Sequence, residues 1–227
     1  MPEPTHVAPP AANRLLAALP RKTYGRLLPS LGLVSLQLEE VIDAPGEPGR
    51  YVYFPTTAVL SMLCTMKNGA RVEFGMVGNE GTTAMAACLG GHASPPLTIV
   101  QVAGDALRIR APKLKAEFDR GGALHDLLLR YVCALVAQIS QSVGCNTHHL
   151  LEARLSRWLL IVHDRVGSDD LRIQHEFLAQ MLGTGRSSVT IAAGSLRNAG
   201  LIRYARGKIR ILDRQGLEAS ACECYAV

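Results

Sequence analysis

Apolar positions between residues 173 and 200 repeat with the spacing of two short amphipathic helices. The positions predicted to share the buried face of the first helix are Leu178, Met181 and Leu182. Gly183 and Gly185 then end this helix and permit the tight turn of a helix-turn-helix. The second helix is predicted to begin near Arg186, and its buried stripe consists of Val189, Ala193 and Leu196.

The opposite face of the second helix is small and mostly polar. At about 100° per residue, the side chains that point outward are those of Ser187, Thr190, Ile191, Gly194 and Asn198. A basic β-hairpin follows, and the segment 183–210 contains no acidic residue and six basic ones: Arg186, Arg197, Arg203, Arg206, Lys208 and Arg210. A basic wing beside an exposed helix face of small side chains predicts DNA binding through the major groove.

From about Val34 to Arg110 the pattern changes to short β-type runs interrupted by glycine and proline. The predicted strands are residues 41–42, 51–54, 59–63, 71–77 and 97–102. Asn68-Gly69 separates two of these runs and favours a tight hairpin, because both residues tolerate positive φ. Many short strands with regular turns predict a β-sandwich or barrel, preceded by short helices near residues 14–19 and 24–28.

Residues 122–147 predict one long helix that is apolar over most of its circumference. The stripe expected to join two subunits consists of Leu124, Leu128, Tyr131, Leu135 and Ile139. A helix of this kind must be covered on two sides, by the β-domain and a partner helix, or else lie buried within a monomer. A further helix, residues 150–166, is expected to support the helix-turn-helix with Trp158 in its core.

Length and composition fit a globular protein of two domains. The chain has 227 residues, is 48% hydrophobic and carries a formal net charge of +5. No uninterrupted apolar run approaches the ~20 residues that span a membrane, and the first residues lack a signal-peptide pattern, so we expect no membrane association. Six scattered cysteines in a chain too large to need disulfide staples are most simply the thiols of a reducing cytoplasm.

A β-rich domain, a long helix and a C-terminal winged helix-turn-helix, in this order, resemble the Crp/Fnr family of bacterial transcription regulators. The most specific portions are GTGRSSVT at residues 183–190 and GKIRIL at residues 207–212, and Val77–Gly81 is a weaker match to the turn beside the family's effector pocket. The resemblance implies an α+β fold with a jelly-roll-like β-roll, a long dimerisation helix and a winged helix-turn-helix. The expected boundaries are a disordered lead at 1–13, the sensor domain at 14–120, the dimerisation helix at 121–147, the DNA-binding domain at 148–218 and a tail at 219–227.

The resemblance also implies a homodimer that binds double-stranded DNA. The implied DNA contacts are Thr184, Arg186, Ser187, Ser188, Thr190, Ile191, Asn198, Arg206 and Lys208. Arg186 matches the family's Arg at the start of the recognition helix, where it would contact a guanine edge or a phosphate. Ser187 stands where the family often has Glu, and Ile191 stands where it often has Arg, so the DNA site is expected to differ from that of the best-known members.

The sensor domain departs from the cyclic-nucleotide binders of the family. Those proteins place an Arg beside a Ser or Thr against the cyclic phosphate, whereas residues 72–107 contain no Lys or Arg, and Pro95-Pro96 stands near the corresponding place. The candidate effector-pocket residues are Glu80, Gly81 and Arg130, although Glu80 is more simply explained as a turn residue. We expect a retained fold with lost or altered ligand chemistry, and no cofactor.

Cysteine and histidine residues form two candidate metal segments. One is residues 145–149, CNTHH, in which Cys145 and His148 have a C-x-x-H spacing, and the other is Cys222-x-Cys224 in the tail. Zinc needs about four converging ligands and each segment supplies at most three, so we expect ordinary thiols and no metal. The N-terminal cysteines of the family's iron–sulfur members are missing, because residues 1–63 contain no Cys.

Together these patterns predict a homodimeric DNA-binding transcription regulator, with RNA polymerase as a further partner if it activates transcription. The alternative is a β-roll small-molecule or metal-binding protein whose basic C-terminal domain serves oligomerisation. The acid-free basic run beside an exposed helix face favours DNA. An enzyme is not expected, because the chain has no G-x-S-x-G, no H-E-x-x-H and no phosphate loop.

Overall fold

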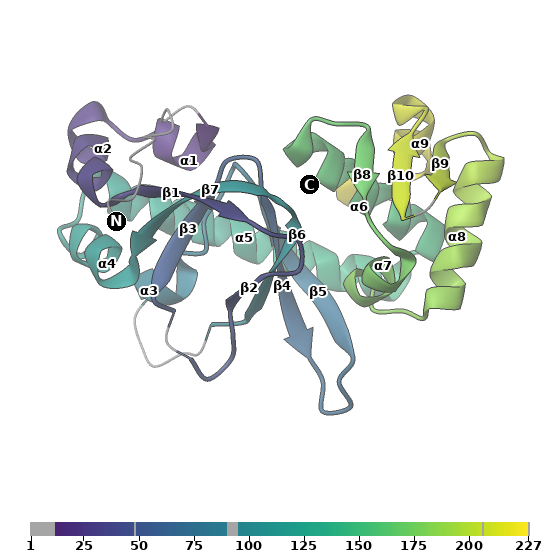
Figure 1. Ribbon diagram of the computed structural model, residues 1–227, viewed down its shortest axis with the longest axis horizontal. Coiled ribbons are helices and arrows are strands. Elements are labelled where there is room, and N and C mark those ends of the chain that lie inside the picture. Colours follow the sequence, from purple (N-terminus) through teal and green to yellow (C-terminus); the bar gives the residue numbers. More distant parts are fainter. Residues whose placement is uncertain (1–11, 48, 90–94, 206, 227) are drawn as a thin grey trace. The chain divides into compact units, whose positions relative to one another are not determined.

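The computed structural model describes residues 12–47, 49–89, 95–205 and 207–226 (Figure 1). The chain divides into two units, one drawn from residues 1–62 and 76–136 and the other from residues 63–75 and 137–227. The predicted α+β fold is confirmed, with antiparallel β-sheets first, then a long helix, then a helical domain with a small sheet.

The first unit consists of two β-sheets with helices before and after them. Its helices are α1 (Arg14–Ala17), α2 (Arg21–Leu27), η2 (Leu28–Ser30), α3 (Met85–Leu89) and α4 (Ala111–Asp119). Its strands are β1 (Gly32–Leu36), β2 (Val41–Asp43), β3 (Tyr51–Pro55), β4 (Val59–Thr65), β5 (Arg71–Val77), β6 (Leu97–Val102) and β7 (Gly104–Arg110). The strand orders are β1-β7-β3 and β2-β6-β4-β5, and residues 63–75, which hold the end of β4, the hairpin turn and most of β5, are counted with the second unit.

The five predicted strands are all present, but the sequence pattern missed β1, β7, α3 and α4. In β7 the turn-like pair Gly104-Asp105 masks a strand whose buried positions are those of Ala106, Leu107 and Ile109. The strand is fixed by pairing on both edges, with β1 on one side and β3 on the other. Such pairing is a tertiary effect that outweighs local propensity.

Asn13 anchors the start of the described chain. Its side-chain oxygen accepts a hydrogen bond from the Leu16 amide at 3.0 Å and so caps α1. Its amide nitrogen donates to the carbonyl oxygens of Pro55 at 2.9 Å and Gly81 at 3.0 Å. We expected disorder through residue 13, and for Asn13 this expectation is wrong because the side chain is fully buried and fully hydrogen-bonded. Residues 1–11 lie outside the described residues.

The long helix α5 (Ala123–His148) begins in the first unit and ends in the second. Leu124 and Leu128 belong to the core of the first unit, with Tyr131 packed against them, and Leu135 is also buried. Most of the stripe that we expected between two subunits therefore faces the interior of the protomer. The exposed large apolar side chains of α5 are instead Leu129, Val136 and Val143.

The second unit is a helical domain with one small sheet. Its further helices are α6 (Leu151–Val166), α7 (His175–Met181), α8 (Arg186–Asn198), α9 (Arg214–Ser220) and η3 (Glu223–Ala226). Its strands are β8 (Asp170–Arg172), β9 (Ile202–Ala205) and β10 (Lys208–Ile211), in the order β8-β10-β9. The buried face of α6 includes Leu155, Trp158 and Leu159, and α6 packs against both α8 and α9. The predicted supporting helix and the core position of Trp158 are both confirmed.

Candidate nucleic-acid interface

The turn between α7 and α8 is held by glycine conformation and by backbone hydrogen bonds. Gly183 has φ 59°, a left-handed conformation that glycine adopts without strain, and the Thr184 amide donates to the Ala179 carbonyl at 2.9 Å. Arg154 of α6 donates a hydrogen bond to the Leu182 carbonyl, so the end of α7 is tied to the supporting helix. Gly185 is the N-cap residue of α8, which begins at Arg186 as the sequence predicts.

Helix α8 presents one apolar face to the domain and one mixed face to solvent. The buried side chains are those of Val189, Ala192, Ala193 and Leu196. The exposed ones are those of Arg186, Ser187, Thr190, Ile191, Ser195, Arg197 and Asn198. Ile191 is 69% exposed, so its side chain is available for contact with a partner. Thr184 and Ser188 are half-buried at the base of this face.

The small sheet of β8, β10 and β9 lies beside α8 (Figure 1). This sheet carries a cluster of positive charge. Its exposed cations are Arg172, Arg203, Lys208 and Arg210, and Arg206 lies outside the described residues. Lys208 is the register partner of Arg172, while Arg210 is the register partner of Arg203 on one side and of Asp170 on the other. Like charges directly opposite each other destabilise a sheet, and a bound anion would offset this repulsion. The counter-charge nearest to it is Asp170, whose carboxylate lies 3.9 Å from the Arg210 guanidinium.

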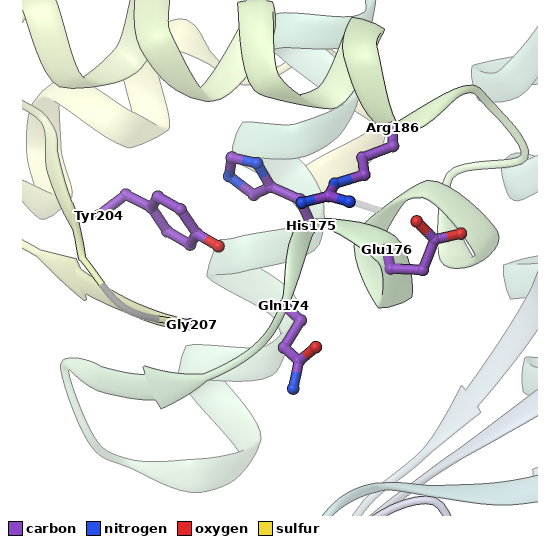
Figure 2. A pocket seen from close by; sticks show the side chains of 6 residues that line it. All are labelled: Gln174, His175, Glu176, Arg186, Tyr204 and Gly207. Atoms are coloured by element: carbon purple, nitrogen blue, oxygen red, sulfur yellow. The ribbon is translucent and has the colours of Figure 1, made fainter.

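His175 connects α7, α8 and the wing in a way that sequence reasoning missed. Its Nδ1 lies 3.0 Å from the Thr190 hydroxyl, and its ring stacks on Tyr204 with centroids 4.0 Å apart (Figure 2). The Thr190 hydroxyl in turn donates to the Arg186 carbonyl at 3.0 Å. Burial, together with the neighbouring Arg186 guanidinium, lowers the pKa of His175, so the ring is neutral at pH 7. The imidazole therefore contacts both α8 and β9 from the start of α7.

A polar groove of about 370 Å³ lies between the start of α8 and the wing. Its lining residues are Gln174, His175, Glu176, Arg186, Tyr204 and Gly207 (Figure 2). No local pattern could have identified His175 or Tyr204, because the two residues are 29 positions apart and meet only through β9 and α7. Arg186 lines this groove at the edge of the exposed helix face.

The candidate effector residues occupy a tight turn in the first unit. Glu80 accepts a hydrogen bond from the Gly78 amide at 3.1 Å, which is the behaviour of a turn residue. Gly81 lies directly under Tyr131, since a Cβ atom there would approach the Tyr131 hydroxyl to 2.4 Å. Arg130 is exposed on α5, and the structure gives no contact that brings it to this turn among the residues described.

The C-terminal domain matches a known family model. Residues 153–220 match the Crp-like helix-turn-helix domain, which is a region that contains α7, the turn, α8 and the wing. Over 61 residues, or 27% of this chain and 30% of that protein, the chain is 38% identical to the transcriptional regulator SdrP of Thermus thermophilus. The global nitrogen regulator of a Synechocystis species is 22% identical over 88% of this chain and 92% of its own length.

Solved structures extend the likeness to the whole fold. A transcriptional regulator of the Crp/Fnr family from Eubacterium rectale superposes with a TM-score of 0.72 at 18% identity, over 92% of this chain and 98% of that one. FixK2 of Bradyrhizobium japonicum gives a TM-score of 0.71 at 14% identity, over 85% and 98%. The chain therefore has the fold of Crp/Fnr regulators and a Crp-like helix-turn-helix domain, and these relatives are regulators rather than enzymes.

Proposed function

We propose that this chain, which carries a Crp-like helix-turn-helix domain on a Crp/Fnr fold, is a homodimeric DNA-binding transcription regulator. The observation that carries the proposal is the exposed face of α8 beside four exposed cations of the wing. A helix of this kind fits the major groove, while cations on a neighbouring sheet neutralise phosphates. The target of such a protein is chromosomal DNA.

The side chains of α8 divide the recognition between polar and apolar contacts. Arg186 has a guanidinium that can bind guanine O6 and N7 or a phosphate, and its backbone stands at the first turn of the helix. Ile191, one and a half turns later, offers a methyl surface that suits the methyl group of thymine. The Thr190 hydroxyl donates its hydrogen bond to the Arg186 carbonyl, so the main role of Thr190 is to stabilise the start of α8.

In vitro selection of duplex DNA by the purified protein, followed by a gel shift with and without added salt, tests this proposal. Arg186→Ala is expected to weaken binding to the selected site by about 1–3 kcal/mol, or roughly 5- to 150-fold. Lys113→Ala is the matched control, because it removes one exposed cation from α4, which is an element of the other unit. Selection of no common sequence, or equal binding by Arg186→Ala, would contradict the assignment of α8.

The dimer interface that we propose lies on the exposed face of α5. Leu129, Val136 and Val143 follow one another at seven-residue intervals, which is the repeat of a coiled-coil seam. Val132, Cys133, Ile139 and Ser140 lie within about 60° of this line. A second copy of α5 is the partner that matches a straight heptad stripe, and the two recognition helices would then face half-sites about one helical turn apart.

A lipid bilayer is the other environment that could cover α5. Among the described residues, α5 is the helix that is long and apolar enough to cross a membrane, with mean hydropathy 1.3. One such helix is weak support, and the burial of Leu124, Leu128 and Leu135 within the first unit leaves only one side of α5 for any partner. A second copy accounts for that one-sided exposure.

Light scattering on the purified protein distinguishes these cases. The wild type is expected to be a dimer at micromolar concentration, and Val136→Asp is expected to be monomeric because a buried carboxylate pair would repel across the seam. Ala134→Asp is the control, since Ala134 is exposed on the opposite side of the helix. A monomeric wild type, or partition of the wild type into lipid vesicles, would refute the proposed dimer face.

We also propose that DNA binding needs no cyclic nucleotide. The stretch 72–107 supplies no Lys or Arg for a cyclic phosphate, and Glu80 is engaged by its own turn. Burying the phosphate without a cation costs several kcal/mol. A micromolar Kd corresponds to a binding free energy of only about 8 kcal/mol, so this cost would remove most of it.

A further inference from the structure

Three cysteines and one histidine of the second unit converge at the end of α5. Cys145 and His149 stand four residues apart where this helix ends, and Cys222 and Cys224 come from the chain's C-terminal segment. The sulfur atoms and a ring nitrogen of these four residues all lie within 4.8 Å of one another. The sequence pattern paired Cys145 with His148 and treated the tail separately. In the structure His148 is exposed, and His149 takes its place.

The distances within this cluster match one metal ion. The sulfur atoms of Cys145 and Cys222 are 3.5 Å apart, and the Cys224 sulfur is 3.5 Å from Nδ1 of His149. Tetrahedral zinc, with Zn–S bonds of about 2.3 Å and Zn–N bonds of about 2.0–2.1 Å, separates its ligand atoms by about 3.5–3.8 Å. A multinuclear iron–sulfur cluster would hold thiolates farther apart, because its ligands are distributed over several irons.

The surroundings of the four residues orient them for metal binding. Nε2 of His149 lies 3.2 Å from the Glu223 carboxylate, so the proton is held on Nε2 and the Nδ1 lone pair faces the sulfur atoms. The side-chain amide of Gln141 donates to the Cys224 sulfur at 2.9 Å and so orients this sulfur. Arg157 of α6 donates to the Cys224 carbonyl at 3.2 Å and brings a positive charge beside the site.

The tail that supplies two of the ligands is fixed independently of any ion. The Tyr225 hydroxyl donates to the Asp164 carboxylate at 2.8 Å and accepts from Arg214 at 2.7 Å. These contacts hold the C-terminal segment against α6. Cys145, Cys222 and Cys224 are all buried, so the ligands are preorganised and shielded from water.

We propose that Cys145, His149, Cys222 and Cys224 form a structural zinc site that joins both ends of the DNA-binding domain. Three thiolates and one imidazole suit Zn²⁺, and four protein ligands leave no open position for catalysis. The chain between Cys145 and Cys222 contains α6, α7, α8 and the wing, so the ion closes a loop around the whole helix-turn-helix. An ion that binds the native state and not the unfolded chain shifts the folding equilibrium toward the native state. The site does not depend on the proposed function.

Metal analysis of untagged full-length protein, purified under reducing conditions, tests the site. We expect about one zinc per chain. After chelation, added Co²⁺ should give the visible bands of a tetrahedral ion and a thiolate charge-transfer band. Chelation should also lower the unfolding temperature reported by Trp158, the single tryptophan of the chain.

Matched pairs of variants locate the ligands. Cys222→Ser and His149→Ala are expected to lose the metal, whereas Cys133→Ser and His148→Ala, which change exposed neighbours on the same helix, should keep it. Glu223→Gln leaves the ligands intact and should weaken metal affinity about 10- to 100-fold, which keeps the proposal testable if a ligand variant fails to fold.

Three results would overturn the site. They are a wild type that binds neither zinc nor cobalt, equal metal loss in His148→Ala and His149→Ala, and a Cys145–Cys222 disulfide in the protein isolated from cells. Bound iron with inorganic sulfide would overturn the assignment to zinc.

Discussion

The positive charge of the wing sets the salt dependence of DNA binding, and Lys208→Ala measures it. Lys208 is exposed on β10 directly opposite Arg172, and it has no acidic register partner. Each neutralised phosphate contributes about 0.9 to the slope of log affinity against log salt. A homodimer loses two such contacts, so the slope should fall by about 1.8. When the salt concentration rises from about 50 to about 200 mM, the wild type should therefore lose roughly 12-fold more affinity than the variant does.

Asp170→Asn provides the opposite perturbation on the same sheet. It removes the carboxylate that lies 3.9 Å from the Arg210 guanidinium and so frees this cation for a phosphate. The slope should become steeper by up to about 1.8, because two subunits each gain one contact. Fluorescence anisotropy with selected and scrambled duplexes, measured over a salt series, gives the slopes. Each variant should change the slope by the same amount on the selected duplex as on the scrambled one, since phosphate contacts carry no sequence information.

Lys113→Ala serves as the control in this assay, because it changes the net charge by the same amount at an exposed position on a helix of the first unit. An unchanged slope for Lys208→Ala would show that the wing does not contact DNA. A loss confined to the selected duplex would show instead that Lys208 reads bases. A change of about 0.9 rather than 1.8 would show that only one wing of the assembly is engaged.

Three further predictions concern ligand binding by the first unit and the stability of the two units. Calorimetry should detect no cAMP or cGMP binding tighter than about millimolar, because the pocket region supplies no cation for the phosphate; micromolar binding that Arg130→Ala abolishes would show that α5 supplies it. Because the folded-state pKa of His175 lies below its unfolded value of about 6.5, the unfolded chain binds the proton more tightly. The urea midpoint followed by Trp158 should therefore fall as the pH drops below about 6.5, and less steeply in His175→Gln; equal pH dependence of the two proteins would contradict the assignment. Asn13→Ala should destabilise the first unit by about 3 kcal/mol in calorimetry, since it removes three buried hydrogen bonds, and an unchanged transition would show that α1 does not hold the Gly81 turn.

The sequence by itself determined the elements whose burial pattern is local. Helical spacing predicted the start of α8 at Arg186 and the burial of Val189, Ala193 and Leu196. The β-type runs likewise predicted β5 and β6 with their observed bounds. The helix prediction succeeded because one face of α8 is buried, which imposes the helical period on its residues. By contrast, β6 is buried at five consecutive positions, and its run of apolar and β-branched residues identified it. The fold class and the Crp-like order of its parts follow from the same patterns.

Only the tertiary structure decided which face of α5 is exposed to solvent. The helix is apolar on more than one side, so its sequence does not say which side the first unit covers. The core covers Leu124 and Leu128, and the exposed line through Val136 lies about 100° further round the helix. The same limit applies to His175 and Tyr204, whose contact depends on the packing of α7 against the wing.

The cluster of Cys145, His149, Cys222 and Cys224 shows most clearly the difference between what sequence spacing predicts and what tertiary packing brings together. Spacing along the chain groups residues that are close in sequence, and it therefore selected His148 and left the tail apart. The helix places residues four positions apart on one face, and the docking of η3 on α6 brings two further thiols to that face. Ligands contributed by segments more than 70 residues apart converge only after the chain has folded, because their proximity is a property of packing and not of local sequence.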